Sequence, residues 1–149
     1  MKRAFLILIV ALLTHQVRGQ RYDLRRAAAP GAAAFVAGAA WGAHEGLTHH
    51  WPAVHAKFPR LPATWWNPAE SWRNKYFQRD PEQGRRPVPV QFTDAKHLLV
   101  TGHNVALFAA GVSISLNRRR PWQHYLLDAG ISLAAYSAGN FVTYNLVFR

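Results

Sequence analysis

Three long runs of mostly apolar residues alternate with polar segments along the chain, and each run has the length of a helix. The runs cover about residues 31–50, 94–116 and 121–148. A helix needs about 20 apolar residues to cross the hydrocarbon core of a bilayer. The pattern therefore predicts an all-α fold, a small transmembrane helix bundle with three spans.

Local signals predict where these helices begin. Pro30 suits the first position of a helix, because its missing N–H would have no partner there. Thr93 is expected to cap the second helix, with Asp94 in the first turn, where the helix dipole favours a carboxylate. Pro121 opens the third helix. Residues 51–92 hold most of the prolines, so this connection is expected to be a loop.

The chain starts with the pattern of an export signal. Lys2 and Arg3 precede a short apolar run at 4–14, and Gly19 supplies a small residue for cleavage. Residues 1–19 are expected to be a signal peptide, or an N-terminal anchor helix if they are retained. Residues 20–149 would then form a single membrane-embedded helical domain.

One face of the first predicted helix carries small residues at intervals of four. Gly38, Gly42 and Gly46 follow Ala34 in this series. In lipid, such a face allows two helix backbones to approach closely. We therefore expect these glycines to serve helix packing, and the same face could join the chain to a second copy or to another protein.

The connection between the first two helices mixes aromatic rings with charges, as in "WWNPAESWRNKY" at 65–76. Tryptophan and tyrosine prefer the membrane–water boundary, where basic side chains can pair with lipid phosphates. The segment is expected to lie on the bilayer as an interfacial loop, or to pack compactly on its own tryptophans. The residues of this loop are Trp65, Trp66, Asn67, Ser71, Trp72, Arg73, Asn74, Lys75 and Tyr76.

Charge and cysteine content narrow the choice of partners. The chain carries 18 basic and 7 acidic residues, a net charge of +11, which attracts anionic partners. The export signal and the apolar runs favour anionic membrane lipids and argue against nucleic acid. There is no cysteine, so disulfides, thiol catalysis and thiolate metal sites are excluded.

Ionisable residues also occur inside the apolar runs, where each one marks a candidate site. Glu45 and His49 share a face of the first helix, and Asp94 and His97 begin a polar stripe on the second, with His103 on the adjoining face. Histidine and carboxylate groups from separate helices could bind a divalent metal such as zinc or iron. Alternatively, these groups pair with one another and tie the helices together.

Three strings, "WNPAESWRNKY", "DPEQG" and "FTDAKHL", are similar to the shared segment of a family of small, uncharacterised bacterial membrane proteins. The similarity covers about residues 30–104. The resemblance implies a protein of the bacterial envelope and implies no particular activity. We expect an integral protein of the inner membrane. It singles out Asn67, Ser71, Trp72, Asn74, Lys75, Asp94 and His97.

Three functions are compatible with these features. The first is a small bacterial envelope protein with a polar His/Asp/Glu cluster under the interfacial loop. The second is a membrane-embedded, metal-dependent enzyme acting on a lipid or a lipid-linked substrate. The third is a non-catalytic helix-packing partner in a membrane complex.

Overall fold

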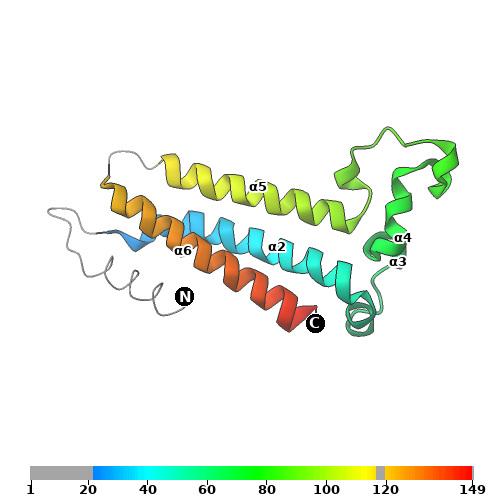
Figure 1. Cartoon of the computed structure of the whole chain (residues 1–149), viewed down its shortest axis with the longest axis horizontal. Helices are drawn as coiled ribbons and strands as arrows, with labels where there is room; N and C mark the ends of the chain where they lie inside the picture. Colours follow the sequence, from blue (N-terminus) through cyan, green and yellow to red (C-terminus); the bar gives the residue numbers. More distant parts are fainter. Residues whose placement is uncertain (1–21, 117–119, 149) are drawn as a thin grey trace.

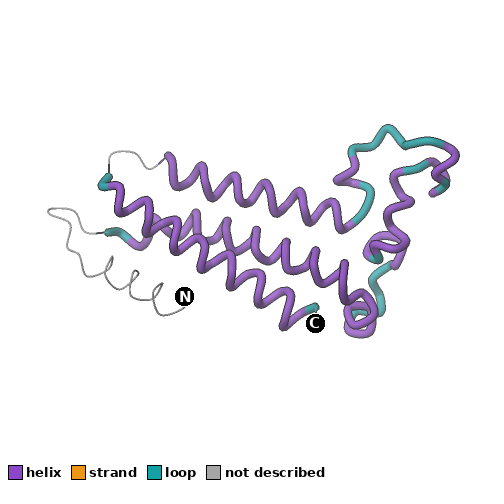
Figure 2. Tube along the Cα trace, in the orientation of Figure 1, coloured by secondary structure: helices purple, strands orange, loops and turns teal. Residues whose placement is uncertain are grey.

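The computed structural model describes residues 22–116 and 120–148, so the expected signal or anchor at 1–19 lies outside the described part. Three long helices form the body of the molecule (Figure 1). They are α2 (Leu24–Lys57), α5 (Ala95–Leu116) and α6 (Trp122–Phe141), the last continued by the π-helical segment η5 (Val142–Val147). Within the described ranges there is no β-strand, as Figure 2 shows. The expected all-α fold is confirmed.

Helix α2 lies at the centre of the bundle. It packs along both α5 and α6, which scarcely touch each other. Gly31 near the start of α2 lies beside Ile131 of α6, and Gly46 further along α2 lies beside Phe148 at the far end of the chain. Helices α2 and α6 therefore run parallel. Helix α5, which lies between them in the sequence, runs in the opposite direction.

Helix α2 extends beyond the predicted range at both ends. It begins at Leu24 because the carboxylate of Asp23 accepts the Arg25 N–H at 3.0 Å, so Pro30 lies inside the helix and not at its first position. At the other end the helix kinks at His50 and continues to Lys57. Pro52 follows the kink, where its missing N–H breaks the regular hydrogen-bond series.

The predicted loop at 51–92 is mostly built from short helices. Prolines that prevent one long helix start two short ones, because Asn67 caps the helix beginning at Pro68 and Asp80 caps the one beginning at Pro81. The elements are α3 (Ala63–Trp66), α4 (Pro68–Ser71), η1 (Trp72–Lys75), η2 (Phe77–Arg79), η3 (Pro81–Gln83) and η4 (Val90–Phe92). We refer to residues 58–94 as the loop segment.

Asp94, and not Thr93, caps α5. The Asp94 carboxylate accepts the backbone N–H of His97 at 2.9 Å, which is the bond of an N-cap side chain. The hydroxyl of Thr93 instead donates to the carbonyl of Val90 at 2.7 Å. The prediction was therefore wrong by one residue.

A small apolar core joins the loop segment to the bundle. Leu47 and Val54 of α2 and Ala95 of α5 are buried there. The side chains packed against them come from α2, the loop segment, α5 and the C-terminal end, namely Trp51, Leu61, Trp65, Trp66, Leu99 and Phe148.

Within the described part of the chain, α5 is the one helix that is long and apolar enough by itself to cross a membrane. Helices α2 and α6 do not meet that measure individually, because glycine and polar residues are interspersed along both.

Candidate functional site

The glycine face of α2 is filled by α6 of the same chain. A Cβ atom added at Gly38 would overlap the carbonyl oxygen of Tyr136, and one at Gly42 would lie 2.7 Å from the carbonyl oxygen of Asn140. Gly139 of α6 meets the backbone of α2 at Phe35 in the same way. The glycines thus pack two helices within one chain, and α6 already occupies the face at Gly38 and Gly42.

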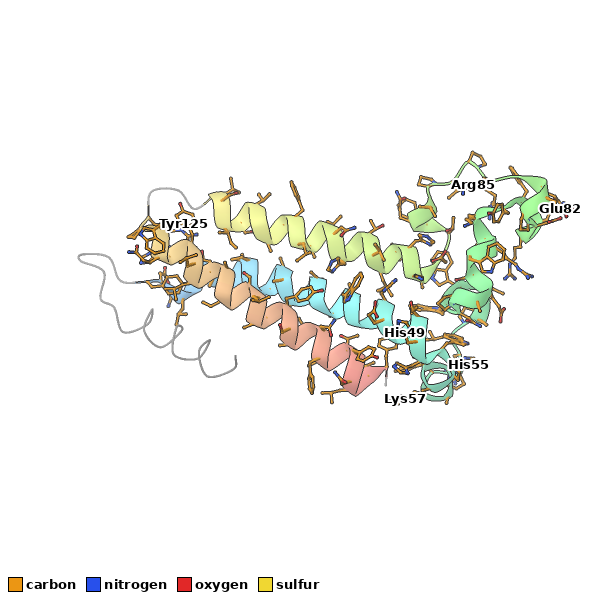
Figure 3. The ribbon with its side chains drawn as sticks, viewed as in Figure 1. His49, His55, Lys57, Glu82, Arg85 and Tyr125 are labelled. Carbon is orange, nitrogen blue, oxygen red and sulfur yellow. The ribbon has the colours of Figure 1, made fainter. Side chains whose placement is uncertain are left out.

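Glu45 forms its contacts within α2. One carboxylate oxygen lies 3.3 Å from Nδ1 of His44, and the other lies 3.3 Å from Nε2 of His49. His44 is buried, whereas His49 is exposed near the loop end of α2, where Figure 3 labels it.

Asp94 and His97 form a second pair at the start of α5. His97 Nδ1 lies 2.7 Å from the buried carboxylate of Asp94, which also accepts the hydroxyl of Thr93 at 3.3 Å. The ring of His97 remains partly exposed, so this pair faces the loop end of the bundle.

His103 lies further along α5 and turns towards α2. Its Nδ1 donates to the carbonyl of Ala37 at 3.1 Å. The ring also packs against Trp41 and Tyr136, with centroid distances of 5.1 and 5.8 Å. Trp41 in turn stacks on His44 at 4.9 Å.

The five residues predicted as metal ligands therefore separate into three places. In the described part of the chain, no group of three or more His, Cys, Asp or Glu side chains is arranged to hold a metal ion. The alternative of mutual pairing fits better, although Glu45–His49 and Asp94–His97 each pair within one helix. The polar ties between helices are made elsewhere, by His103 and by His50, whose Nε2 lies 2.8 Å from the hydroxyl of Tyr144.

The loop residues singled out by the sequence divide into two groups, of which the first holds the loop segment in shape. Asn67 caps α4, and Ser71 is fully buried. The side-chain amide of Asn74 donates to the carbonyls of Thr64 at 2.7 Å and of Thr93 at 2.9 Å, which fastens the loop segment to the start of α5. Trp65 and Trp66 pack on the apolar core.

The second group forms what we call the aromatic–cationic patch: Trp72, Arg73, Lys75 and Tyr76. The guanidinium carbon of Arg73 lies 5.5 Å from the Trp72 ring centroid. The ammonium of Lys75 lies 5.8 Å from the Trp72 ring and 5.3 Å from the Tyr76 ring. Trp72 is 38% exposed, so this part of the loop segment faces outward.

Sequence analysis missed a buried cluster at the opposite end of the bundle. Arg120 lies 2.5 Å from the carboxylate of Asp128 and donates to the carbonyl of Ile114 at 3.1 Å, which joins α6 to the end of α5. The hydroxyl of Tyr22 also donates to Asp128. Burial, and then this hydrogen bond, raise the pKa of the Tyr22 phenol above its usual value. The available signal was Asp128, an acidic residue within an apolar helix, close in sequence to an arginine run.

Comparison with models of protein families, with curated proteins and with solved structures gives no match to this chain. Its function is therefore argued from its own side chains and their surroundings.

Proposed function

We propose that the chain is an integral membrane protein in which α2, α5 and α6 cross the bilayer together, with the loop segment at the membrane–water boundary. One observation carries this proposal: the bundle exposes large apolar side chains on its surface and buries ionisable side chains among small apolar ones. A protein folded in water has the opposite distribution.

The outer surface of the bundle is apolar on all three helices. Phe108 of α5 is 75% exposed, and Val36 of α2 and Leu133 of α6 are also exposed. Large exposed apolar side chains on all three helices are typical of a protein that meets a membrane or a partner.

The interior contains ionisable groups. Asp128 is 1% exposed, and His44 and His124 are buried as well. Polar groups within membrane spans face the bundle interior, because contact with hydrocarbon would leave them without solvation. Several of the glycines and polar residues that lower the hydropathy of α2 and α6 face other helices, including Gly38, Gly139 and Asp128. This arrangement supports membrane crossing by the whole bundle even though α5 alone is sufficiently apolar.

Location and partners form the second half of the proposal. The resemblance of the loop strings supports the bacterial inner membrane, and the net charge of +11 supports anionic lipids as the surrounding partner. The candidate ligands lie in three separate places in the described part of the chain, which does not favour a metal-dependent activity.

Single cysteines test the three spans, since the chain has no cysteine of its own. Val36→Cys, Val105→Cys and Leu133→Cys place one thiol on the outer face of each helix, and Glu82→Cys places one on the loop segment (Figure 3). In broken membranes treated with a water-soluble maleimide, we expect only Glu82→Cys to react. All four variants should react after denaturation in detergent, which controls for the presence of the thiol.

Two results would contradict the proposal in different ways. If Val36→Cys and Leu133→Cys react as fast as Glu82→Cys while Val105→Cys stays protected, α5 alone crosses the membrane. If all four react alike in membranes, none of the helices crosses it.

A further inference from the structure

We propose that the aromatic–cationic patch is a binding site for the phosphate headgroup of an anionic phospholipid. The proposal rests on the proposed function, which places the loop segment at the membrane surface. It adds a ligand class and the residues that bind it.

The rings of the patch hold its cations in place. Trp72 and Tyr76 pack edge to face, with centroids 6.0 Å apart and an angle of 87° between their planes. Arg73 and Lys75 lie above these rings, which attract cations through their negative faces. A guanidinium and an ammonium positioned in this way retain N–H donors for a phosphate oxygen.

Across residues 22–116 and 120–148, no carboxylate forms an ion pair with the cations of the patch, Arg73 and Lys75. Glu70, the nearest acidic residue in sequence, accepts a hydrogen bond from the side chain of Asn67. The carboxylate of Asp80 accepts the backbone N–H of Glu82. In the described part of the chain, these nearby carboxylates therefore bond to other groups and not to the two cations, which suits an external anion.

The backbone beside the patch is fixed and brings further basic residues near it. Tyr76 and Arg85 form an antiparallel bridge, with hydrogen bonds from the Phe77 N–H to the Gly84 carbonyl at 3.1 Å and from the Arg86 N–H to the Lys75 carbonyl at 2.8 Å. The side chain of Asn74 fastens the same segment to the carbonyl of Thr93, two residues before α5 begins. The site is thus held by hydrogen bonds on both sides of the two cations.

Exposed apolar side chains flank these charges. Phe77 directly follows the patch and is exposed, and Phe92 near the start of α5 is 60% exposed. In Figure 1 the loop segment lies beyond the ends of α2 and α5 and extends past α5 on the side away from α6. Rings, cations and exposed phenylalanines at one end of a membrane bundle match the headgroup zone, where a phosphate lies next to hydrocarbon.

A lipid titration tests this site. The full chain carrying Phe77→Cys, its only thiol, is labelled with an environment-sensitive bimane and dissolved in an uncharged detergent. Short-chain phosphatidylglycerol should give a saturable change in fluorescence, and phosphatidylcholine a much weaker one. Adding Arg73→Gln and Lys75→Gln should raise the Kd for phosphatidylglycerol about 30-fold, since each basic group at an anionic surface contributes about fivefold.

The matched control is Lys57→Gln with Arg60→Gln, which removes the same charge at the same end of the bundle, outside the patch. These residues are exposed, so their replacement should change the Kd by less than about threefold. The proposal is wrong if both double variants weaken binding equally, or if phosphatidylcholine binds as well as phosphatidylglycerol. It is also wrong if inorganic phosphate or an RNA oligonucleotide competes as strongly as the lipid.

This titration is independent of the cysteine experiment on the bundle. Reaction of Val36→Cys and Leu133→Cys in membranes would contradict the three spans. An unchanged Kd for the Arg73→Gln and Lys75→Gln variant would contradict the headgroup site alone.

Discussion

Individual glycines set the distance between α2 and α6. At Gly38 and Gly139 the backbone of the other helix lies where a side chain would begin. The glycines of α5 differ, because nothing lies within 4 Å of a Cβ atom added at Gly102 or Gly111. A side chain can therefore be added at the glycines of α5 but not at Gly38 or Gly139.

We predict that Gly38→Ala lowers stability by about 1 to 3 kcal/mol or more, because the added methyl group collides with a carbonyl oxygen that cannot move independently of its helix. Gly111→Ala should be neutral or stabilising by up to about 1 kcal/mol, since it raises helix propensity in open space. Thermal unfolding in detergent measures both. Equal shifts in Tm for the two variants would mean that α2 and α6 do not meet at Gly38.

For individual residues, the sequence predicted which ones take part in packing or polar pairing, but it did not predict their contacts. The interval of four between glycines predicted a packing face, but it could not say whether the partner helix belonged to the same chain. Asp94 and His97 are three residues apart, which allowed their pairing. A metal site, however, requires side-chain directions from two helices, and spacing within one helix does not supply them.

Among the elements, α5 and α6 were predicted closely because each is a mostly apolar run with a clear start, at Asp94 and at Pro121. Helix α2 was predicted too short, since Pro30 is tolerated inside it and the helix resumes after the kink at His50. The short helices of the loop segment were missed because prolines were interpreted as helix breakers. Pro68 and Pro81 instead occupy first positions, behind caps formed by Asn67 and Asp80.

The end of α5 is joined to α6 by the buried pair Arg120 and Asp128. We predict that Arg120→Gln destabilises the protein by about 3 to 5 kcal/mol, because it leaves the Asp128 carboxylate buried without its cation. Arg120→Gln combined with Asp128→Asn should recover part of this loss by removing the unpaired charge. Chemical denaturation in mixed micelles measures the three proteins, and a double variant no better than the single one would show that the charges are not coupled.

The arrangement of the whole molecule was not predictable from helix patterns alone. Three alternating spans require α2 and α6 to run parallel, but they do not specify which helix lies in the centre. The structure places α2 there, against both others. Its small residues explain why, because a narrow helix allows two neighbours to approach at once.

We predict that Gly31→Cys and Ile131→Cys form an intramolecular disulfide under mild oxidation. A Cβ atom added at Gly31 lies 3.7 Å from Cγ2 of Ile131, the branch that a cysteine sulfur would replace, so thiols at these two positions can approach each other. Gly31→Cys with Leu146→Cys is the control, since those positions lie at opposite ends of the parallel pair. Intact mass after alkylation shows which double variant has formed the disulfide. A disulfide only in the control would mean that α6 runs antiparallel to α2.

The parallel packing of α2 and α6 also has a consequence for biosynthesis. A ribosome makes α2, then the loop segment and α5, and only afterwards the helix that covers the glycine face. Until α6 emerges, nascent α2 has no permanent neighbour on its narrowest side. Assembly of this bundle can therefore be completed only after α6 has been made, at the end of translation.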